Sequence, residues 1–228
     1  MVEQTVPVSS PRGHRLVADD QLPVWMHRLV GAVDQAELPE PLRTLAGMAP
    51  PLARRGAVLM LFGDGPAGPD LLLTERAATM RSHAGQPAFP GGAVDPGEDA
   101  VTAALREGFE ETGLLPSSVL PAALLPELFL PPSGFLVRPV LAYWQQPGEV
   151  RPVDPAETAM VARVPVRALA DPVNRGQVQH SSGYIGPAFR VADLLVWGFT
   201  AGLVAVLLDL GGWTVPWDQG RIFELDER

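Results

Sequence analysis

The chain is 228 residues long, and 46% of these residues are hydrophobic, which is enough to build the core of one large domain. Its 26 acidic residues outnumber the 17 basic ones, and the net charge of −9 argues against non-specific binding to nucleic acid or anionic membranes. The chain has no cysteine, so disulfide bonds and thiol chemistry are excluded.

The N-terminal part of the chain is expected to lie outside the catalytic domain. Residues 1–50 are expected to form a tail and one helix, and residues 51–228 the domain itself. Residues 1–15 lack the apolar core of a secretory signal. Apolar residues recur with helical spacing from Leu22 to Glu37, which predicts a helix that packs outside the catalytic core.

Apolar runs separated by turn residues predict strands. Residues 57–62 and 70–74 flank a Gly-Asp-Gly-Pro turn and are expected to be neighbours. Further strands are expected over residues 122–130, 135–145 and 160–164. The apolar stretch 196–210 is shorter than the roughly 20 residues needed to cross a bilayer, so it predicts a buried helix of a cytoplasmic protein.

A further helix is predicted over residues 100–112. Asp99 is the expected N-cap, because its side chain can accept from the first free backbone amides, and Gly113 is the expected end. Asp95-Pro96 offers an earlier start for the same helix.

Three glutamates of this helix share one face, because residues three and four positions apart are neighbours on an α-helix. They are Glu107, Glu110 and Glu111. Three carboxylates repel one another until a multivalent cation binds between them, and oxygen ligands of this kind suit Mg²⁺ or Mn²⁺. An acidic run alone is more often a solvated helix face, so the residues around it decide between the two interpretations.

The surrounding residues favour a metal site. The pair Gly91-Gly92 precedes the helix, and Glu98 stands eight residues before Arg106. Arg106 can pair with Glu98 and hold the loop that follows Gly92, which leaves the other glutamates for a metal.

Together these residues resemble the signature of the Nudix hydrolases: Gly, five residues, Glu, seven residues, Arg-Glu, two residues, Glu-Glu, one residue, Gly. Every charged and glycine position is matched between Gly92 and Leu114, and Gly108 departs from the apolar residue that is usual there. The resemblance implies an α/β (α+β) fold with a mixed β-sheet sandwiched between helices. It also implies Mg²⁺ or Mn²⁺ bound by the three glutamates and by a backbone carbonyl at Gly91 or Gly92.

A second run of residues, Leu72–Gly92, leads directly into this signature. It resembles the motif of the coenzyme A diphosphatase branch: Leu-Leu-Thr, two spaced arginines, a glycine and Phe-Pro-Gly-Gly. The matching positions here are Arg76, Arg81, Gly85 and Phe89–Gly92. Coenzyme A carries a 3′-phosphate besides its diphosphate, and two guanidinium groups beside the metal site could clamp that extra charge.

Each of these substrate-binding candidates has a plainer interpretation. Without the motif, Arg76 and Arg81 would be two solvated loop charges. His83 is as compatible with a loop histidine that satisfies backbone groups as with a phosphate contact. Phe89 is expected to anchor the loop in the core rather than to contact adenine.

Looser similarity to the family continues downstream. Glu157 matches an acidic position of the branch, but Met160 stands where a second glutamate is common. The run Trp197–Ala201 is similar to the family's Trp-Gly-x-Thr-Ala and is interpreted as the start of a packed core helix. The carboxylates that could accept the proton of the attacking water are Glu107, Glu111 and Glu157.

The resemblance implies hydrolysis of the diphosphate of coenzyme A or its derivatives to 4′-phosphopantetheine and adenosine 3′,5′-bisphosphate. One alternative is the same chemistry on ADP-ribose or a dinucleotide. Another is a ligand-binding regulator without turnover, which the complete set of carboxylates disfavours. The expected partner is a small-molecule substrate rather than nucleic acid or membrane, and the sequence leaves open whether the protein is a homodimer.

Overall fold

The computed structural model describes residues 13–35, 48–80, 84–131, 133–181 and 183–225. Within them, nine strands form one sheet with the core order β1-β6-β8-β2-β3-β4, while β5 pairs with β2, β7 with β8 and β9 with β3. The strands are β1 (His14–Arg15), β2 (Arg54–Gly65), β3 (Gly68–Arg76), β4 (Pro87–Ala88), β5 (Gly91–Ala93), β6 (Val119–Leu124), β7 (Leu128–Leu130), β8 (Phe135–Trp144) and β9 (Thr158–Pro165). The sheet is mixed, because β2 runs parallel to β8 and antiparallel to β3.

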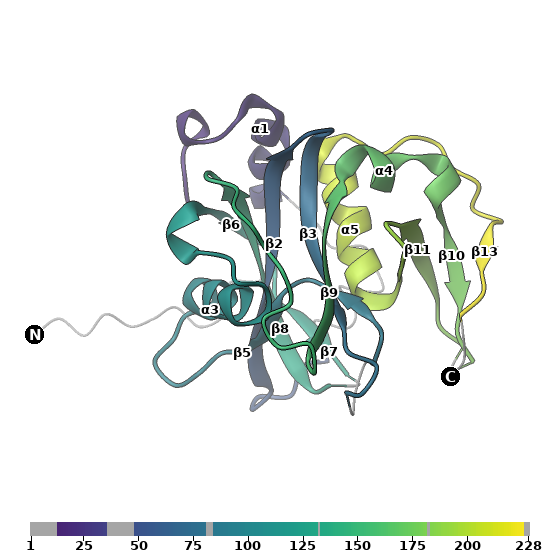
Figure 1. The fold of residues 1–228 in the computed structure, drawn as a ribbon, viewed down its shortest axis with the longest axis horizontal. Coiled ribbons are helices and arrows are strands. Elements are labelled where there is room, and N and C mark those ends of the chain that lie inside the picture. Colours follow the sequence, from purple (N-terminus) through teal and green to yellow (C-terminus); the bar gives the residue numbers. More distant parts are fainter. Residues whose placement is uncertain (1–12, 36–47, 81–83, 132, 182, 226–228) are drawn as a thin grey trace, which may run out of the picture.

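The helices and a second, smaller sheet surround this main sheet (Figure 1). The α-helices are α1 (Val24–Gly31), α3 (Ala100–Thr112), α4 (Val166–Ala170) and α5 (Gly198–Gly211). The second sheet has the order β12-β11-β10-β13 and consists of β10 (Arg175–Gln179), β11 (Ile185–Val191), β12 (Leu194–Val196) and β13 (Ile222–Phe223). No described helix is both long and apolar enough to cross a membrane.

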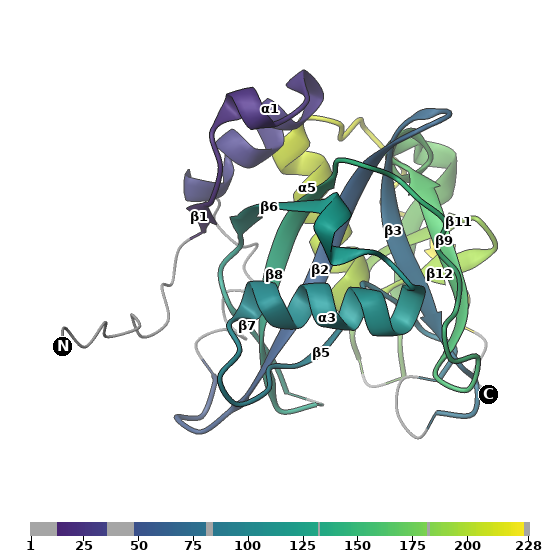
Figure 2. The same cartoon turned by 60° about the vertical axis from the view of Figure 1, so that its left-hand side comes forward.

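Alternation along β2 builds the two layers of the core, because successive side chains of a strand point to opposite faces. Leu59 and Leu61 pack on the face that α3 covers, and Met60 and Phe62 pack on the face that α5 covers. Figure 2 shows α3 lying across its face of the sheet. The expected mixed sheet sandwiched between helices is therefore confirmed.

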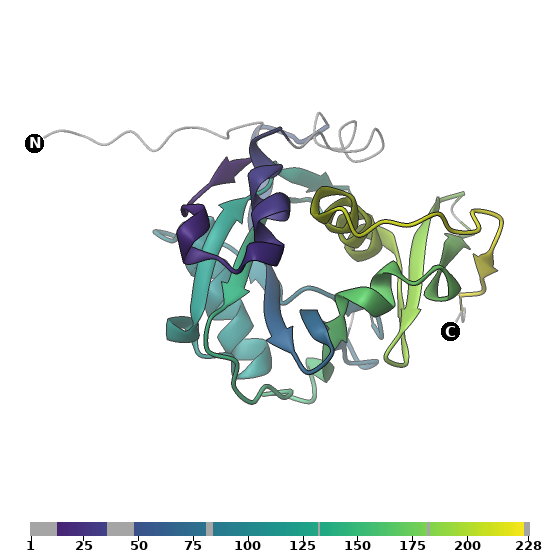
Figure 3. The ribbon, with the colours of Figure 1, turned by 90° about the horizontal axis from the view of Figure 1, so that it is seen from above.

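Helix α1 packs in the main core, so the prediction that the N-terminal helix lies outside it is wrong. Its buried side chains belong to the same hydrophobic cluster as those of α5 and β2, and Figure 3 shows α1 beside α5. They are Met26, Leu29 and Val30. Helix α5 is apolar around most of its circumference, and α1 covers part of the surface that the sheet does not reach. Trp25 Nε1 also donates to Asp64 Oδ1 at 2.9 Å.

Helix α3 begins and ends as predicted. Asp99 accepts a hydrogen bond from the Thr102 amide at 2.8 Å, and Gly113 ends the helix with a left-handed φ of 73°. The helix therefore does not start at Asp95-Pro96. A Cβ on Gly108 would lie 2.9 Å from the Leu59 side chain, so this glycine lets α3 approach β2 closely.

The strand predictions hold for the first sheet with shifted boundaries. β2 and β3 form the expected pair of neighbours, but β2 continues to Gly65, so the turn falls at Pro66-Ala67. The single strand expected over residues 122–130 is two strands, β6 and β7. The second sheet was not predicted.

Strands β2 and β3 separate toward the site. β3 pairs with β2 at Phe62–Gly65, whereas β5 pairs with β2 at residues 56–58. The segment 87–93 lies between the two separated strands. Its first part, β4, pairs with the C-terminal end of β3, and its last part, β5, pairs with β2. This segment brings the Gly91-Gly92 pair under α3.

Candidate active site

Arg106 is the centre of an ion-pair network on α3. Its Nε and Nη2 donate to Glu98 at 2.9 and 3.1 Å, and its Nη1 donates to Glu107 at 2.9 Å and to Glu110 at 3.1 Å. Nη2 also donates to the Ala93 carbonyl at 2.9 Å. The hydrogen bonds from Arg106 lower the pKa of Glu98. The expected contact between Glu98 and Arg106 is therefore present, and it fastens the loop before α3 to the helix.

Glu111 is the least compensated carboxylate of the site. Its Oε2 is buried and has no hydrogen-bond partner among the described residues. Burial, with a contribution from the charge of Glu107, raises the pKa of Glu111 to about 7, although Arg76 and the Gly91 amide act in the opposite direction. Burial also raises the pKa of Glu107.

The two glycines of β5 allow the strand to fit between β2 and α3. A Cβ on Gly91 would overlap the Ala57 carbonyl of β2, and a Cβ on Gly92 would overlap the carboxylate of Glu107. A larger residue at position 91 would therefore displace β5 from β2, and one at position 92 would displace the Glu107 side chain. This packing leaves the backbone of β5 directly beside the carboxylates.

Glu157 reaches the site through the loop that precedes β9. Its carbonyl accepts a hydrogen bond from the Ala77 amide at 2.8 Å, and the Val153 amide of the same loop donates to the Glu111 carbonyl at 3.2 Å. The Glu157 side chain is exposed, and its charge contributes to the raised pKa of Glu111. Met160 lies on β9 opposite Glu75.

Arg76 lies at the end of β3, near Glu111. Its Nε is buried without a hydrogen-bond partner in the described part of the chain, and its charge acts on Glu111. The Arg76 amide donates to the Gln86 carbonyl at 3.1 Å, and the Arg76 carbonyl accepts from the Gly85 amide at 3.0 Å. Two other predicted binding residues, Arg81 and His83, lie outside the described residues.

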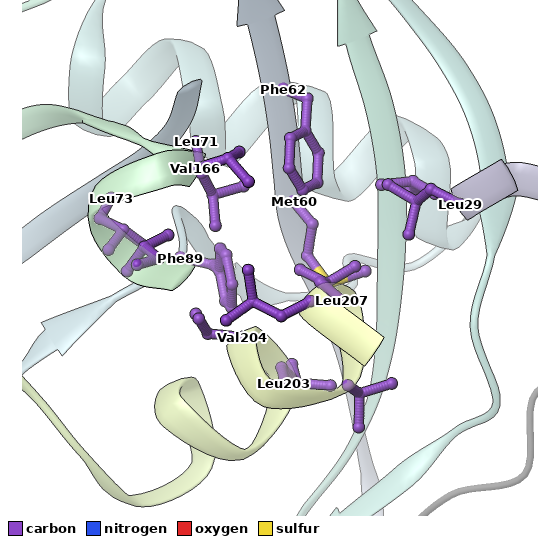
Figure 4. Close-up of a cluster of buried hydrophobic side chains, with 14 of the residues drawn as sticks. Leu29, Met60, Phe62, Leu71, Leu73, Phe89, Val166, Leu203, Val204 and Leu207 are labelled. Carbon is purple, nitrogen blue, oxygen red and sulfur yellow. The ribbon is translucent and has the colours of Figure 1, made fainter. Parts of the chain in front are cut away.

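Phe89 anchors the segment that carries the glycine pair. It is only 3% exposed and lies in the main core. Figure 4 shows its ring beside Leu73, Val204 and Leu207. The expectation of a core anchor is confirmed. Gly85, by contrast, is exposed and has a φ of 67°.

Arg106 pairs with two of the three glutamates that were expected to hold a metal, Glu107 and Glu110. Among the residues that the structure describes, no three acidic or histidine side chains form a group that could hold a metal ion. Glu107 and Glu110 are paired with Arg106, and the Glu110 side chain is 53% exposed. The buried, unpaired oxygen of Glu111 nevertheless fits a hard cation, as does the carboxylate of Glu107 beside β5.

Sequence reasoning expected a backbone carbonyl at Gly91 or Gly92, but it missed two other backbone contacts of this site. The Ala93 carbonyl and the Gly91 amide both act on the charged side chains of α3. Backbone groups carry no signal in residue type, so spacing alone does not reveal them.

The mixed sheet between helices and the Arg106 network on a capped helix define a Nudix hydrolase. The sequence model of the NUDIX domain family matches residues 52–183, more than half of the chain, and the chain belongs to this family. It is therefore a hydrolase of phosphorus-containing anhydrides.

Its relatives agree with this assignment. A Photorhabdus laumondii protein described as "uncharacterized Nudix hydrolase NudL" is 37% identical over 179 residues, covering 75% of this chain and 89% of its own. A relative of the same description from Escherichia coli K12 is 37% identical over 167 residues, covering 68% and 81%. The structure of RenU, a Nudix hydrolase from M. smegmatis, matches with a TM-score of 0.50 at 21% identity, covering 73% of this chain and 91% of RenU, which is a likeness of fold.

Proposed function

We propose that this Nudix hydrolase cleaves the diphosphate of coenzyme A or its derivatives and releases 4′-phosphopantetheine and adenosine 3′,5′-bisphosphate. The observation that carries the proposal is the position of Arg76. Its buried, unpaired guanidinium nitrogen lies close enough to Glu111 to lower the pKa of that carboxyl. An arginine with an unpaired donor nitrogen near the carboxylates suits a substrate with one more phosphate than an ordinary nucleoside diphosphate.

Glu107 and Glu111, with Glu110 and the backbone of Gly91 and Gly92, would hold Mg²⁺ or Mn²⁺. When bound, such a cation neutralises diphosphate oxygens and makes a bound water more acidic. Arg106 donates to Glu98 in the loop before α3 and to Glu107 on α3, so its role would be to orient these carboxylates.

Glu157 is our candidate for the general base. It approaches Glu111 from a separate loop, its side chain is exposed, and its backbone is fixed to Ala77 at 2.8 Å. A carboxylate that is not needed for the cation is free to accept the proton of the attacking water. Glu107 and Glu111 take this role if Glu157 does not.

Arg76 would bind the 3′-phosphate, and the resemblance adds Arg81 as a second cation. Phosphate groups are bound well by guanidinium because its fixed donors match two phosphate oxygens at once. Gly85, whose amide donates to the Arg76 carbonyl, would help to fix the backbone that carries this arginine.

The substrate assignment is tested by identifying products. The purified protein is incubated with Mg²⁺ and coenzyme A, ADP-ribose or a dinucleoside polyphosphate, and the products are resolved by chromatography. We expect the two named products from coenzyme A and slower turnover of the other compounds. Faster cleavage of ADP-ribose or the dinucleotide would assign the site to that substrate class, and activity that persists in a chelator would remove the role of the metal.

A further inference from the structure

We propose that Thr200, at the start of α5, is a positioning residue for substrate binding. Its hydroxyl fixes the edge strand β4, which in turn fixes the backbone of Arg76. The inference rests on the proposed function for the identity of the substrate, whereas its geometry is independent of that identity.

Strand β4 lies at the edge of the main sheet, and its Pro87 carbonyl needs a hydrogen-bond donor. It pairs with β3 through Thr74↔Ala88 and Glu75↔Pro87, and the Arg76 amide donates to the Gln86 carbonyl. Carbonyls of a strand alternate in direction, so if Gln86 points toward β3, Pro87 points away from it. The Pro87 carbonyl therefore needs a donor from outside the sheet.

Thr200 supplies that donor. Its Oγ1 donates to the Pro87 carbonyl at 3.1 Å across 113 positions of sequence, and the residue is only 7% exposed. A threonine in a helix commonly turns its hydroxyl back to a carbonyl of its own helix. Here the hydroxyl instead joins two separate elements, and α5, buried in the main core, provides a rigid support.

The hydrogen bond between Thr200 and Pro87 is linked to Arg76 through the neighbouring residue Gln86. Pro87 follows Gln86 directly, and both Gly85 and Gln86 are hydrogen-bonded to the backbone of Arg76, at 3.0 and 3.1 Å. If Pro87 loses its donor, the pairing that holds the Arg76 backbone loses its outer support. The arginine that we assign to substrate binding would then be less well placed.

The backbone beneath the carboxylates has its own support, separate from that of β4. Phe89 is buried between β4 and β5, and the Pro90 carbonyl accepts from the Leu59 amide at 2.8 Å. Gly91 is further paired with Val58 of β2. Loss of the Thr200 hydroxyl should therefore weaken substrate binding more than it slows the chemical step.

Thr200→Val tests this, because valine keeps the shape and removes the hydroxyl. We expect KM for coenzyme A to rise about three- to tenfold and kcat to stay within about twofold of wild type. Thr200→Ser restores the hydroxyl and should restore KM. Ser118→Ala is the matched control: it removes a buried hydroxyl that donates to Leu115 at 2.6 Å, next to Trp144 and away from β4.

Amide hydrogen exchange gives a readout that does not depend on the substrate. Exchange over residues 84–91 should be faster in Thr200→Val and unchanged in Ser118→Ala. If the wild type does not cleave coenzyme A, the substrate assignment fails, and KM is measured on the diphosphate that it does cleave. An unchanged KM in Thr200→Val would overturn the proposal whether or not exchange changes, as would an equal rise of KM in Ser118→Ala.

Discussion

The carboxylate of Glu107 occupies the space that a side chain on residue 92 would need. A Cβ built on Gly92 would lie 2.8 Å from Glu107 Oε2 and closer still to Oε1. The glycine of the signature is thus required by close packing against the catalytic helix, and its φ is not in the left-handed region.

Gly92→Ala should therefore displace Glu107 and lower kcat by on the order of 10² or more, because a shift of about 1 Å at a catalytic group has effects of this size. The fold should survive, since the Glu107 side chain can move. Steady-state kinetics and a thermal melt measure both effects. Gly148→Ala is the control, because no atom lies within 4 Å of its added Cβ. Normal activity of Gly92→Ala would mean that Glu107 is not needed where it lies.

Glu111→Gln should be much less active than the wild type and, without metal, more stable. Burial raises the pKa of Glu111 from 4.5 to about 7, so the native state binds the proton more tightly than the unfolded state. The free energy of unfolding contributed by this group therefore falls as pH rises from about 4.5 to about 7. Glutamine does not ionise, so the variant lacks this loss of stability at higher pH.

In a chelator at about pH 8, Glu111→Gln should be about 1–3 kcal/mol more stable than the wild type, and the difference should shrink at about pH 5.5. Chemical denaturation at the two pH values measures this. With metal, kcat of the variant should fall by on the order of 10² or more. A stability difference that does not change with pH would contradict the buried, uncompensated carboxylate.

Glu157→Gln tests the assignment of the base. If Glu157 accepts the proton from water, kcat should fall by roughly 10²–10⁴ and the pH–rate profile should lose its acidic limb. Glu149→Gln, an exposed loop residue of the same type, should behave as the wild type. A nearly normal profile for Glu157→Gln would move the role to Glu107 or Glu111.

Local signals in the sequence were sufficient for the catalytic helix. Asp99 and Gly113 define the two ends of α3 through backbone groups close in sequence, and the spacing of Glu98 and Arg106 predicts their ion pair. Signals of this kind need no knowledge of the rest of the fold. The position of Glu157 beside Glu111 does need it, because a loop far along the chain brings the two together.

The second sheet shows why other parts could not be predicted. β10 contains Gly176, and β11 contains Gly186 and Pro187, residue types that are uncommon in strands. The Phe223 ring lies 2.9 Å from the position that a Cβ on Gly176 would take, so this position in β10 has no room for a side chain. Tertiary contact of this kind overrides local preference.

The turn between β11 and β12 offers a test of the second sheet. Ala192 and Asp193 have φ values of 50° and 62°, the left-handed pair of a type I′ turn, and Val191 pairs with Leu194 around them. Alanine is strained there, so Ala192→Gly should raise the free energy of unfolding by about 0.5–1 kcal/mol. Ala159→Gly, in strand β9, should lower it by a similar amount. Destabilisation by Ala192→Gly, measured by denaturation, would contradict the turn.

The most direct test of the proposed function is the ratio of kcat/KM for coenzyme A to kcat/KM for 3′-dephospho-coenzyme A with Mg²⁺. The two compounds differ only in the phosphate that Arg76 is proposed to bind, and a charge-assisted contact contributes about 1.5–3 kcal/mol. The account predicts that coenzyme A is preferred by about ten- to a hundredfold. Equal values, or a preference for the dephospho form, would contradict it.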